Sequence, residues 1–171
     1  RELRGISSTP MEQSPPAKKQ ICVSRSFGKP VEALAEMREA IAAYVTRAGE
    51  KLRRERSAAG AVMVFIMTNR FKAEPQYVNS TVIGLPVCTD CTQELIQYAL
   101  RGVDSIFRTG YRFKKAGVVL GEIRPVDHVQ ADLFDTKDRD SSKRIMETLD
   151  RINARMGSGT LKYAAEGLDK P

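Results

Sequence analysis

Residues 31–56 of the chain read VEALAEMREAIAAYVTRAGEKLRRER. Apolar residues recur here every three or four positions, the spacing that puts side chains on one side of an α-helix: Leu34, Met37, Ile41, Val45, Ala48 and Leu52. Glutamates gather near the start of the stretch and arginines near its end, which suits the helix dipole. We predict a long helix over 31–56, buried along one side and ended by residues 57–60.

Strand patterns flank this helix. Residues 21–27 alternate in polarity, and Gly28-Lys29-Pro30 is expected to end that strand. Residues 61–68, AVMVFIMT, are too apolar and too β-branched for a surface helix. Residues 77–85 alternate again, and Pro86 is expected to close the strand. The parity of this strand that contains Asn79 is largely polar, so we expect that side to face water or a ligand.

A second helix is predicted to begin at Asp90, where Asp90 and Gln93 resemble a capping box, and to end at Gly110. A last strand is predicted over 113–123. The order β-α-β-β-α-β predicts an α+β fold with a four-stranded antiparallel sheet and two helices on one face, ferredoxin-like or a permuted relative of it. The other face of the sheet is expected to stay open.

The chain divides into four parts by composition. Residues 1–19 contain three prolines and are expected to form an extended linker, followed by the folded domain over 20–123. Residues 124–140 are expected to be flexible. Residues 141–171 are expected to form a mostly irregular tail with a short helix over 141–155, where apolar residues again follow helical spacing.

The net charge of +7 is unevenly distributed. Residues 1–60 carry 12 Lys and Arg against 7 Asp and Glu, residues 61–120 carry 7 against 4, and residues 121–171 carry 9 against 10. A basic domain with a neutral tail fits a polyanion-binding module, although such a charge also serves solubility alone. One His, no Trp and three Cys argue against multi-His metal sites and disulfide frameworks, and free Cys favour a reducing, cytoplasmic compartment.

The open sheet face is the first candidate site. Hydroxyl, amide and basic side chains can position a nucleic-acid backbone without reading bases. The candidates are Lys18, Lys19, Ser24, Arg25, Ser26, Asn69, Arg70, Asn79, Arg112, Lys114 and Lys115. A merely solvated sheet face is the alternative.

The second candidate is the stretch QADLF at residues 130–134. Leu133 and Phe134 stand in a charged segment with no core of their own, which favours a peptide that docks into a pocket of another protein, oriented by the Gln130 amide. Folding back onto the domain is the alternative.

The third candidate is Cys88-Thr89-Asp90-Cys91, at the predicted start of the second helix. A helix N-terminus lowers the pKa of a thiol, so a redox or zinc module is an alternative function. Zinc would need two more ligands, and only Cys22 and His128 are left to supply them.

Several stretches together resemble a known family. They are LRG at 3–5 before the Pro-rich linker, ICVSRSFG at 21–28, YRFKKAGV at 111–118, QADLFD at 130–135 and NARMGSGTL at 153–161. In this order, and over nearly the whole chain, they resemble the C-terminal part of the UmuC-type Y-family translesion DNA polymerases.

The resemblance implies that residues 20–123 are the little-finger domain, whose open sheet lies across the DNA major groove, and that residues 1–19 are the tether from the thumb domain. It implies that Gln130, Leu133 and Phe134 bind the DNA sliding clamp. The palm and fingers, with the metal-binding carboxylates, would precede Arg1. We therefore expect no polymerase activity, catalytic residue, metal or cofactor in this chain itself.

The resemblance further implies a parent protein that is an error-prone, DNA-directed DNA polymerase of the SOS response and DNA repair. Its partners would be primer–template DNA, the sliding clamp and, through the parent, a UmuD-type accessory subunit and RecA, in the bacterial cytoplasm and nucleoid and away from membranes. An RNA-binding ferredoxin-like domain is a further alternative. It is disfavoured because such domains stack bases on sheet aromatics, and the first strand offers only Phe27.

Overall fold

The computed structural model of the chain describes residues 18–129 and 138–167. The domain consists of β1 (Ile21–Val31), α1 (Leu34–Arg54), β2 (Ser57–Thr68), β3 (Val78–Thr89), α2 (Thr92–Ile106) and β4 (Phe113–Gly121). A short strand β5 (Arg124–Pro125), the 3-10 turn η2 (Val126–His128), helix α3 (Arg139–Met156) and the 3-10 turn η3 (Ala164–Glu166) follow.

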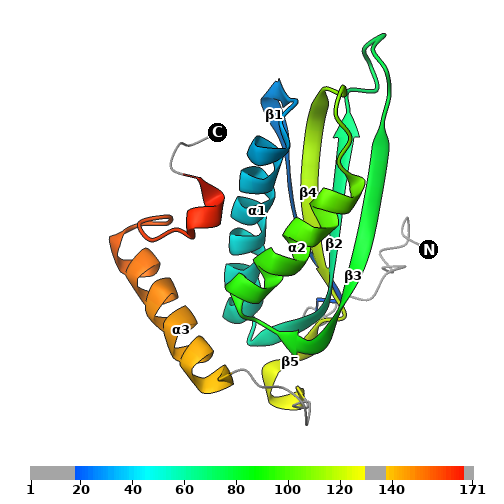
Figure 1. Ribbon diagram of the computed structural model, residues 1–171. Coiled ribbons are helices and arrows are strands. Elements are labelled where there is room, and N and C mark those ends of the chain that lie inside the picture. The colour runs from blue at the N-terminus through cyan, green and yellow to red at the C-terminus, as the bar shows by residue number, and fades with distance from the viewer. Residues whose placement is uncertain (1–17, 130–137, 168–171) are drawn as a thin grey trace, which may run out of the picture.

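The four long strands form an antiparallel sheet in the order β1-β4-β2-β3, and β5 pairs separately with the start of β2. The last long strand, β4, lies between β1 and β2. The two strands that α1 connects are therefore not neighbours in the sheet. Figure 1 shows α1 and α2 side by side on one face of this sheet. The predicted α+β class is confirmed.

The core lies between the helix pair and the sheet. The predicted stripe of α1 is buried at Met37, Ile41, Val45, Ala48 and Leu52. Alternate residues of the two central strands face it, among them Val62, Val64, Ile66, Ala116, Val118 and Leu120. Because both central strands are covered on only one face, their other parity is free to present a surface.

Several predicted element boundaries were wrong, among them the end of the second helix, which is Ile106 and not Gly110. β1 continues through Gly28-Lys29-Pro30 to Val31, and β3 continues through Pro86 to Thr89. Both are edge strands, and the register of each shifts at its proline, so the missing N–H removes no central ladder bond. Residues 57–60 begin β2 rather than ending the helix; the chain reverses at Arg56, whose φ is +48°.

The C-terminal segment packs against the domain. α3 extends slightly beyond the predicted 141–155, and Figure 1 shows it beside the helix layer, on the α1 side. Met146 is buried, and the Tyr163 hydroxyl lies 3.2 Å from its sulfur. Thr46 of α1 donates a hydrogen bond to Glu166 (2.7 Å).

The expectation of a flexible stretch over 124–140 needs correction at both ends. Residues 124–128 form β5 and η2, and the first turn of α3 begins at Arg139 with Asp138 as its N-cap. Residues 130–137 lie outside the described part of the chain. Among the helices that the structure describes, none combines the length and the apolar character needed to cross a bilayer.

Candidate nucleic-acid interface

The face of the sheet opposite α1 and α2 is ordered in three rows that cross all four strands. Paired residues of an antiparallel sheet point to the same side, so the register defines the rows. From β1 to β3 they are Cys22–Val119–Met63–Val82, Ser24–Gly117–Phe65–Ser80 and Ser26–Lys115–Met67–Val78. Hydroxyls and one lysine thus surround a half-buried apolar centre.

Gly117 makes this face flat at its centre. A Cβ atom at Gly117 would lie 2.5 Å from the Phe65 ring and 2.5 Å from Cβ of Ser24. The absence of a side chain therefore lets Phe65 lie across β4. Phe27, the only aromatic residue of the first predicted strand, is on the other parity of β1 and packs against the core instead.

The structure brings together three of the predicted DNA-binding residues on the open face: Ser24, Ser26 and Lys115. The expectation that the Asn79 parity of β3 faces water was wrong. Its amide donates to the Tyr77 hydroxyl (2.9 Å), which in turn donates to the backbone carbonyl of Ile106 in α2 (2.7 Å). The sheet order places that parity against α2 and leaves the other parity open.

Arg25 also belongs to the parity that faces the helices, since it pairs with the buried Ala116. Because β1 is an edge strand, Arg25 stays exposed beside α1. Its charge reaches the Tyr44 hydroxyl: burial raises the pKa of Tyr44, and the positive charges of Arg25 and Arg47 oppose that rise.

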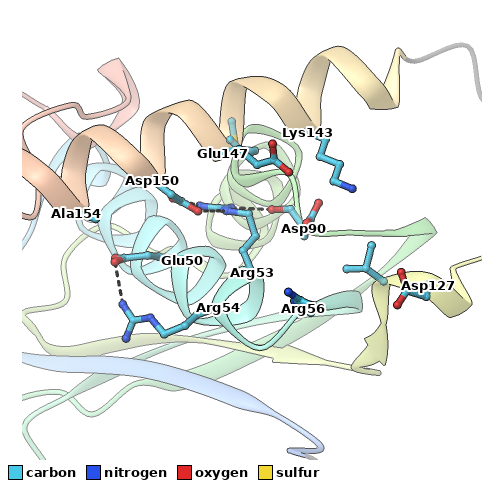
Figure 2. Close-up of a pocket in the computed structure, with 12 residues that line it drawn as sticks. Glu50, Arg53, Arg54, Arg56, Asp90, Asp127, Lys143, Glu147, Asp150 and Ala154 are labelled. Carbon is cyan, nitrogen blue, oxygen red and sulfur yellow. Dashed lines mark hydrogen bonds and ion pairs between the residues drawn. The ribbon is translucent and has the colours of Figure 1, made fainter.

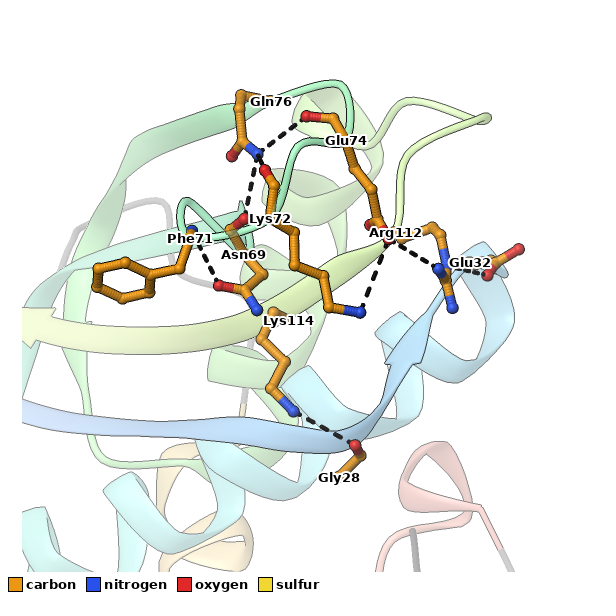
Figure 3. Close-up of polar contacts among 9 residues, drawn as sticks. All are labelled: Gly28, Glu32, Asn69, Phe71, Lys72, Glu74, Gln76, Arg112 and Lys114. Carbon is orange, nitrogen blue, oxygen red and sulfur yellow. Dashed lines mark hydrogen bonds and ion pairs between the residues drawn. The ribbon is translucent and has the colours of Figure 1, made fainter.

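Arg112 and Lys114 are engaged within the domain (Figure 3). Arg112 forms ion pairs with Glu32 and Glu74, each at 3.0 Å. The Lys114 ammonium donates to the carbonyls of Phe27 and Gly28, where β1 bulges away from β4. Both cations hold the end of the sheet in place.

The remaining predicted residues lie at the two ends of the sheet. Asn69 and Arg70 follow β2, in the loop to β3, where the Asn69 side chain accepts a hydrogen bond from the Phe71 N–H (3.1 Å). Lys18 forms an ion pair with Glu55, and Lys19 is exposed just before β1. Gln130, Leu133 and Phe134 lie outside the described residues.

Three basic residues of α1 were not among the predicted DNA-binding residues. Arg47, Lys51 and Arg54 line, with Arg25, a hollow of about 320 Å³ along the β1 edge. Their spacing of four and three residues places them on one side of the helix, and that spacing is a signal the sequence does contain. Among them Arg54 is paired with Glu50 at 3.1 Å.

A larger pocket, of about 630 Å³, separates α1 from α3 (Figure 2). Arg53 crosses it to Asp150. Burial lowers the pKa of Arg53, but the hydrogen bond and charge of Asp150 outweigh this and the pKa lies above its usual value. Burial raises the pKa of Asp90, which also lines this pocket, although the charge of Arg53 opposes the rise. The lining carries both signs of charge, so it does not favour a polyanion.

The cysteine pair lies at the start of α2. Cys91 is buried and its N–H donates to the Thr89 hydroxyl (3.1 Å), whereas Cys88 is half-buried. Cys22 is exposed on the open sheet face, and His128 is exposed in η2. Within residues 18–129 and 138–167, no three His, Cys, Asp or Glu side chains are grouped so that they could hold a metal ion.

The sequence matches the impB/mucB/samB family C-terminal domain over residues 18–133 and a domain of unknown function (DUF4113) over residues 143–171. It is 40% identical to Protein UmuC of Salmonella typhimurium over 172 residues, which is 99% of this chain and 41% of that protein. It is 40% identical to Protein ImpB of Salmonella typhimurium over 98% of this chain and 40% of that protein, and 40% identical to Protein MucB of Escherichia coli over 99% and 40%.

The chain thus spans about two fifths of the length of these relatives. The resemblance to UmuC-type proteins drawn from the sequence motifs is confirmed. Since the family match covers residues 18–133, well over half of the chain, the protein belongs to the impB/mucB/samB family and contains the C-terminal domain of that family.

Proposed function

We propose that this domain is the little finger of a UmuC-like translesion DNA polymerase and that it binds primer–template DNA along its open sheet face. The observation that carries the proposal is the alignment of Ser24, Ser26 and Lys115 on the helix-free face of the sheet. Family membership supports the same role.

The chemistry of the face suits a DNA backbone. Hydroxyls donate to phosphate oxygens, and a lysine neutralises a phosphate and releases its counterions. Arg25 and the basic residues of α1 at the neighbouring edge extend the positive field beyond the sheet. The half-buried Met63 and Phe65 leave few groups that could discriminate between bases, so binding should depend on salt far more than on sequence.

Binding of duplex DNA by the 171-residue chain at several salt concentrations tests this. We expect the logarithm of the affinity to fall steeply and linearly with the logarithm of the salt concentration. Lys115→Ala should reduce this slope by the contribution of about one phosphate contact. Lys143→Ala, which removes an exposed lysine from α3, is the matched control. A flat salt response of the unmodified chain would contradict the proposal.

We propose in addition that residues 130–134 tether the polymerase to the sliding clamp. Two weak contacts in one chain raise the effective concentration of each, which keeps a loosely bound polymerase at a lesion. Replacing Leu133 and Phe134 with Ala should abolish clamp binding and leave duplex binding intact. Unchanged clamp affinity would overturn the tether.

The proposal places nucleotidyl transfer in the parent polymerase, outside this domain. The parent would act in SOS translesion synthesis and repair in the bacterial cytoplasm. A UmuD-type accessory subunit and RecA would be its further partners. Primer extension by this chain alone, in the presence of Mg²⁺ and deoxynucleotides, should give no product above background.

A further inference from the structure

The loop between β2 and β3 presents an aromatic ring to solvent. Phe71 is 86% exposed, more than any other large apolar side chain of the described residues. Figure 3 shows its ring pointing away from Gln76, Glu74 and Arg112. At this position the ring contributes little to the stability of the fold, because an aromatic side chain stabilises a protein mainly when it is buried.

The loop is fixed from within by Gln76. Its amide nitrogen lies within hydrogen-bond distance of the carbonyls of Asn69 (3.1 Å), Lys72 (2.9 Å) and Glu74 (2.9 Å), and its amide oxygen accepts from the Thr68 hydroxyl (2.9 Å). With the Asn69 side chain bonded to the Phe71 N–H, the backbone that carries the ring is set before any ligand arrives.

The guanidinium of Arg70 lies over the Phe71 ring, 5.1 Å from its centroid. Within the described residues no carboxylate forms an ion pair with Arg70, whereas Lys72 and Arg112 are both paired with Glu74. The loop therefore offers one unpaired positive charge beside one exposed ring, while Glu74 pairs with the neighbouring cations Lys72 and Arg112.

We propose that the Arg70–Phe71 pair is a stacking site for one unpaired base of a single-stranded nucleic acid, with Arg70 contacting a neighbouring phosphate. An aromatic face accepts any base, and stacking contributes substantially to single-strand binding. A nucleic acid satisfies both halves of the site at once, because each nucleotide carries a flat ring and an anion. The inference rests on the proposed DNA-binding function and adds to it a contact to unpaired template.

A protein partner is the competing occupant, since exposed aromatic and arginine side chains also mark protein interfaces. The local charge favours the nucleic acid: Arg70 is unpaired, and Lys114 and Lys115 belong to the same end of the sheet, next to the bulge of β1. A lone ring beside a free cation also lacks the surrounding apolar area that a protein interface core requires.

The test compares the 171-residue chain with its Phe71→Ala, Phe71→Tyr and Arg70→Ala variants. The probes are a fluorescein-labelled 12-nucleotide single strand and the duplex of the same sequence. Met156→Ala is the matched control, because Met156 is 70% exposed on α3. A second single strand carries 2-aminopurine, whose fluorescence falls when the base stacks.

We expect Phe71→Ala to weaken single-strand binding about tenfold and to abolish the 2-aminopurine quenching, while Phe71→Tyr and Met156→Ala change neither. Arg70→Ala should lower the salt slope for the single strand by about 0.7. Duplex binding should change less than about twofold, because a paired base offers no free face to the ring.

Unchanged single-strand affinity of Phe71→Ala would overturn the inference, and so would equal losses for single strand and duplex. Loss of sliding-clamp binding with intact single-strand binding would assign the loop to a protein partner and likewise overturn it. If the unmodified chain failed to bind duplex at any salt, the proposed function would fail. The single-strand measurements would still decide the role of Phe71.

Discussion

Arg53 of α1 and Asp150 of α3 form a two-pronged ion pair, with Nε–Oδ2 at 2.6 Å and Nη2–Oδ1 at 2.8 Å. The Arg53 side chain is only 9% exposed, and its third nitrogen reaches the Asp90 carbonyl and the Thr92 hydroxyl at the start of α2. One side chain thus joins the C-terminal helix to both helices of the domain. The two sequence regions that match separate families are connected at this point.

Arg53→Ala should therefore release α3. Removing one partner of a largely buried ion pair leaves the charge of the other partner without a counter-charge. Because Asp150 is partly exposed to water, we expect a loss of about 2 kcal/mol in the free energy of unfolding. Urea unfolding and proteolytic cleavage within 138–167 would measure it. Arg54→Ala, which removes an exposed arginine one position along, should leave both measurements unchanged. Equal protease resistance of the Arg53 variant would contradict the docking role.

Gly117→Ala should disturb the centre of the open sheet face. The new Cβ would clash with the Phe65 ring, and overpacking of this kind costs about 1–3 kcal/mol. Gly121→Ala is the matched control, because it lies on the same strand and face with no atom within 4 Å of its added Cβ. Thermal unfolding would separate the two variants. Equal stability of the two variants would contradict the close packing of Phe65 against Gly117.

The order of helices and strands could be predicted because it depends on local periodicity. The stripe of α1 from Met37 to Leu52 is buried as its spacing requires, and the apolar run of β2 forms a central strand. The wrong ends predicted for β1 and β3 have one cause. Pro30 and Pro86 end a strand only where their missing N–H would face a neighbour, and the sequence does not tell which strands are at the edges.

The composition of the candidate site was harder to predict for the same reason. Ser24 and Arg25 are neighbours in sequence and lie on opposite faces of β1, and only the sheet order decides which face is covered. Its polarity suggested that Asn79 faces water, yet its amide donates a hydrogen bond to the Tyr77 hydroxyl, which in turn donates to the Ile106 carbonyl of α2. The exposed Val78 and Val82 show that an apolar parity can be the open one.

Lys114→Ala should loosen the bulge of β1 without affecting the opposite end of the sheet. The ammonium satisfies two carbonyls that the bulge withdraws from the ladder, and loss of such hydrogen bonds costs about 1 kcal/mol. Amide hydrogen exchange should accelerate at residues 27–29 and 31 and stay unchanged at residues 21–23. Lys29→Ala, which removes an exposed lysine from the same bulge, is the control. If both variants exchange alike, the Lys114 contact does not hold the bulge.

Asp138 should make the start of α3 sensitive to acid. The Ser141 side chain hydrogen-bonds to the Asp138 carboxylate, which also accepts a hydrogen bond from the Ser141 N–H (2.9 Å), and these bonds, the side-chain bond most of all, lower the pKa of Asp138 below the ordinary value of 3.8. Because the pKa of Asp138 is lower in the folded than in the unfolded protein, the charged cap stabilises the helix at any pH above the ordinary pKa. This stabilisation is lost as the pH falls through the pKa of the folded protein.

Asp138→Ala should therefore speed amide exchange at Ser141 and Ser142 at neutral pH. Asp138→Ser, whose hydroxyl can still cap, should retain most of the protection at every pH. Exchange at Met146, beyond the first turn, serves as the internal reference. If the difference between Asp138→Ala and the unmodified chain persisted far below pH 3.8, the protection would come from the fold of the segment and not from the charged cap.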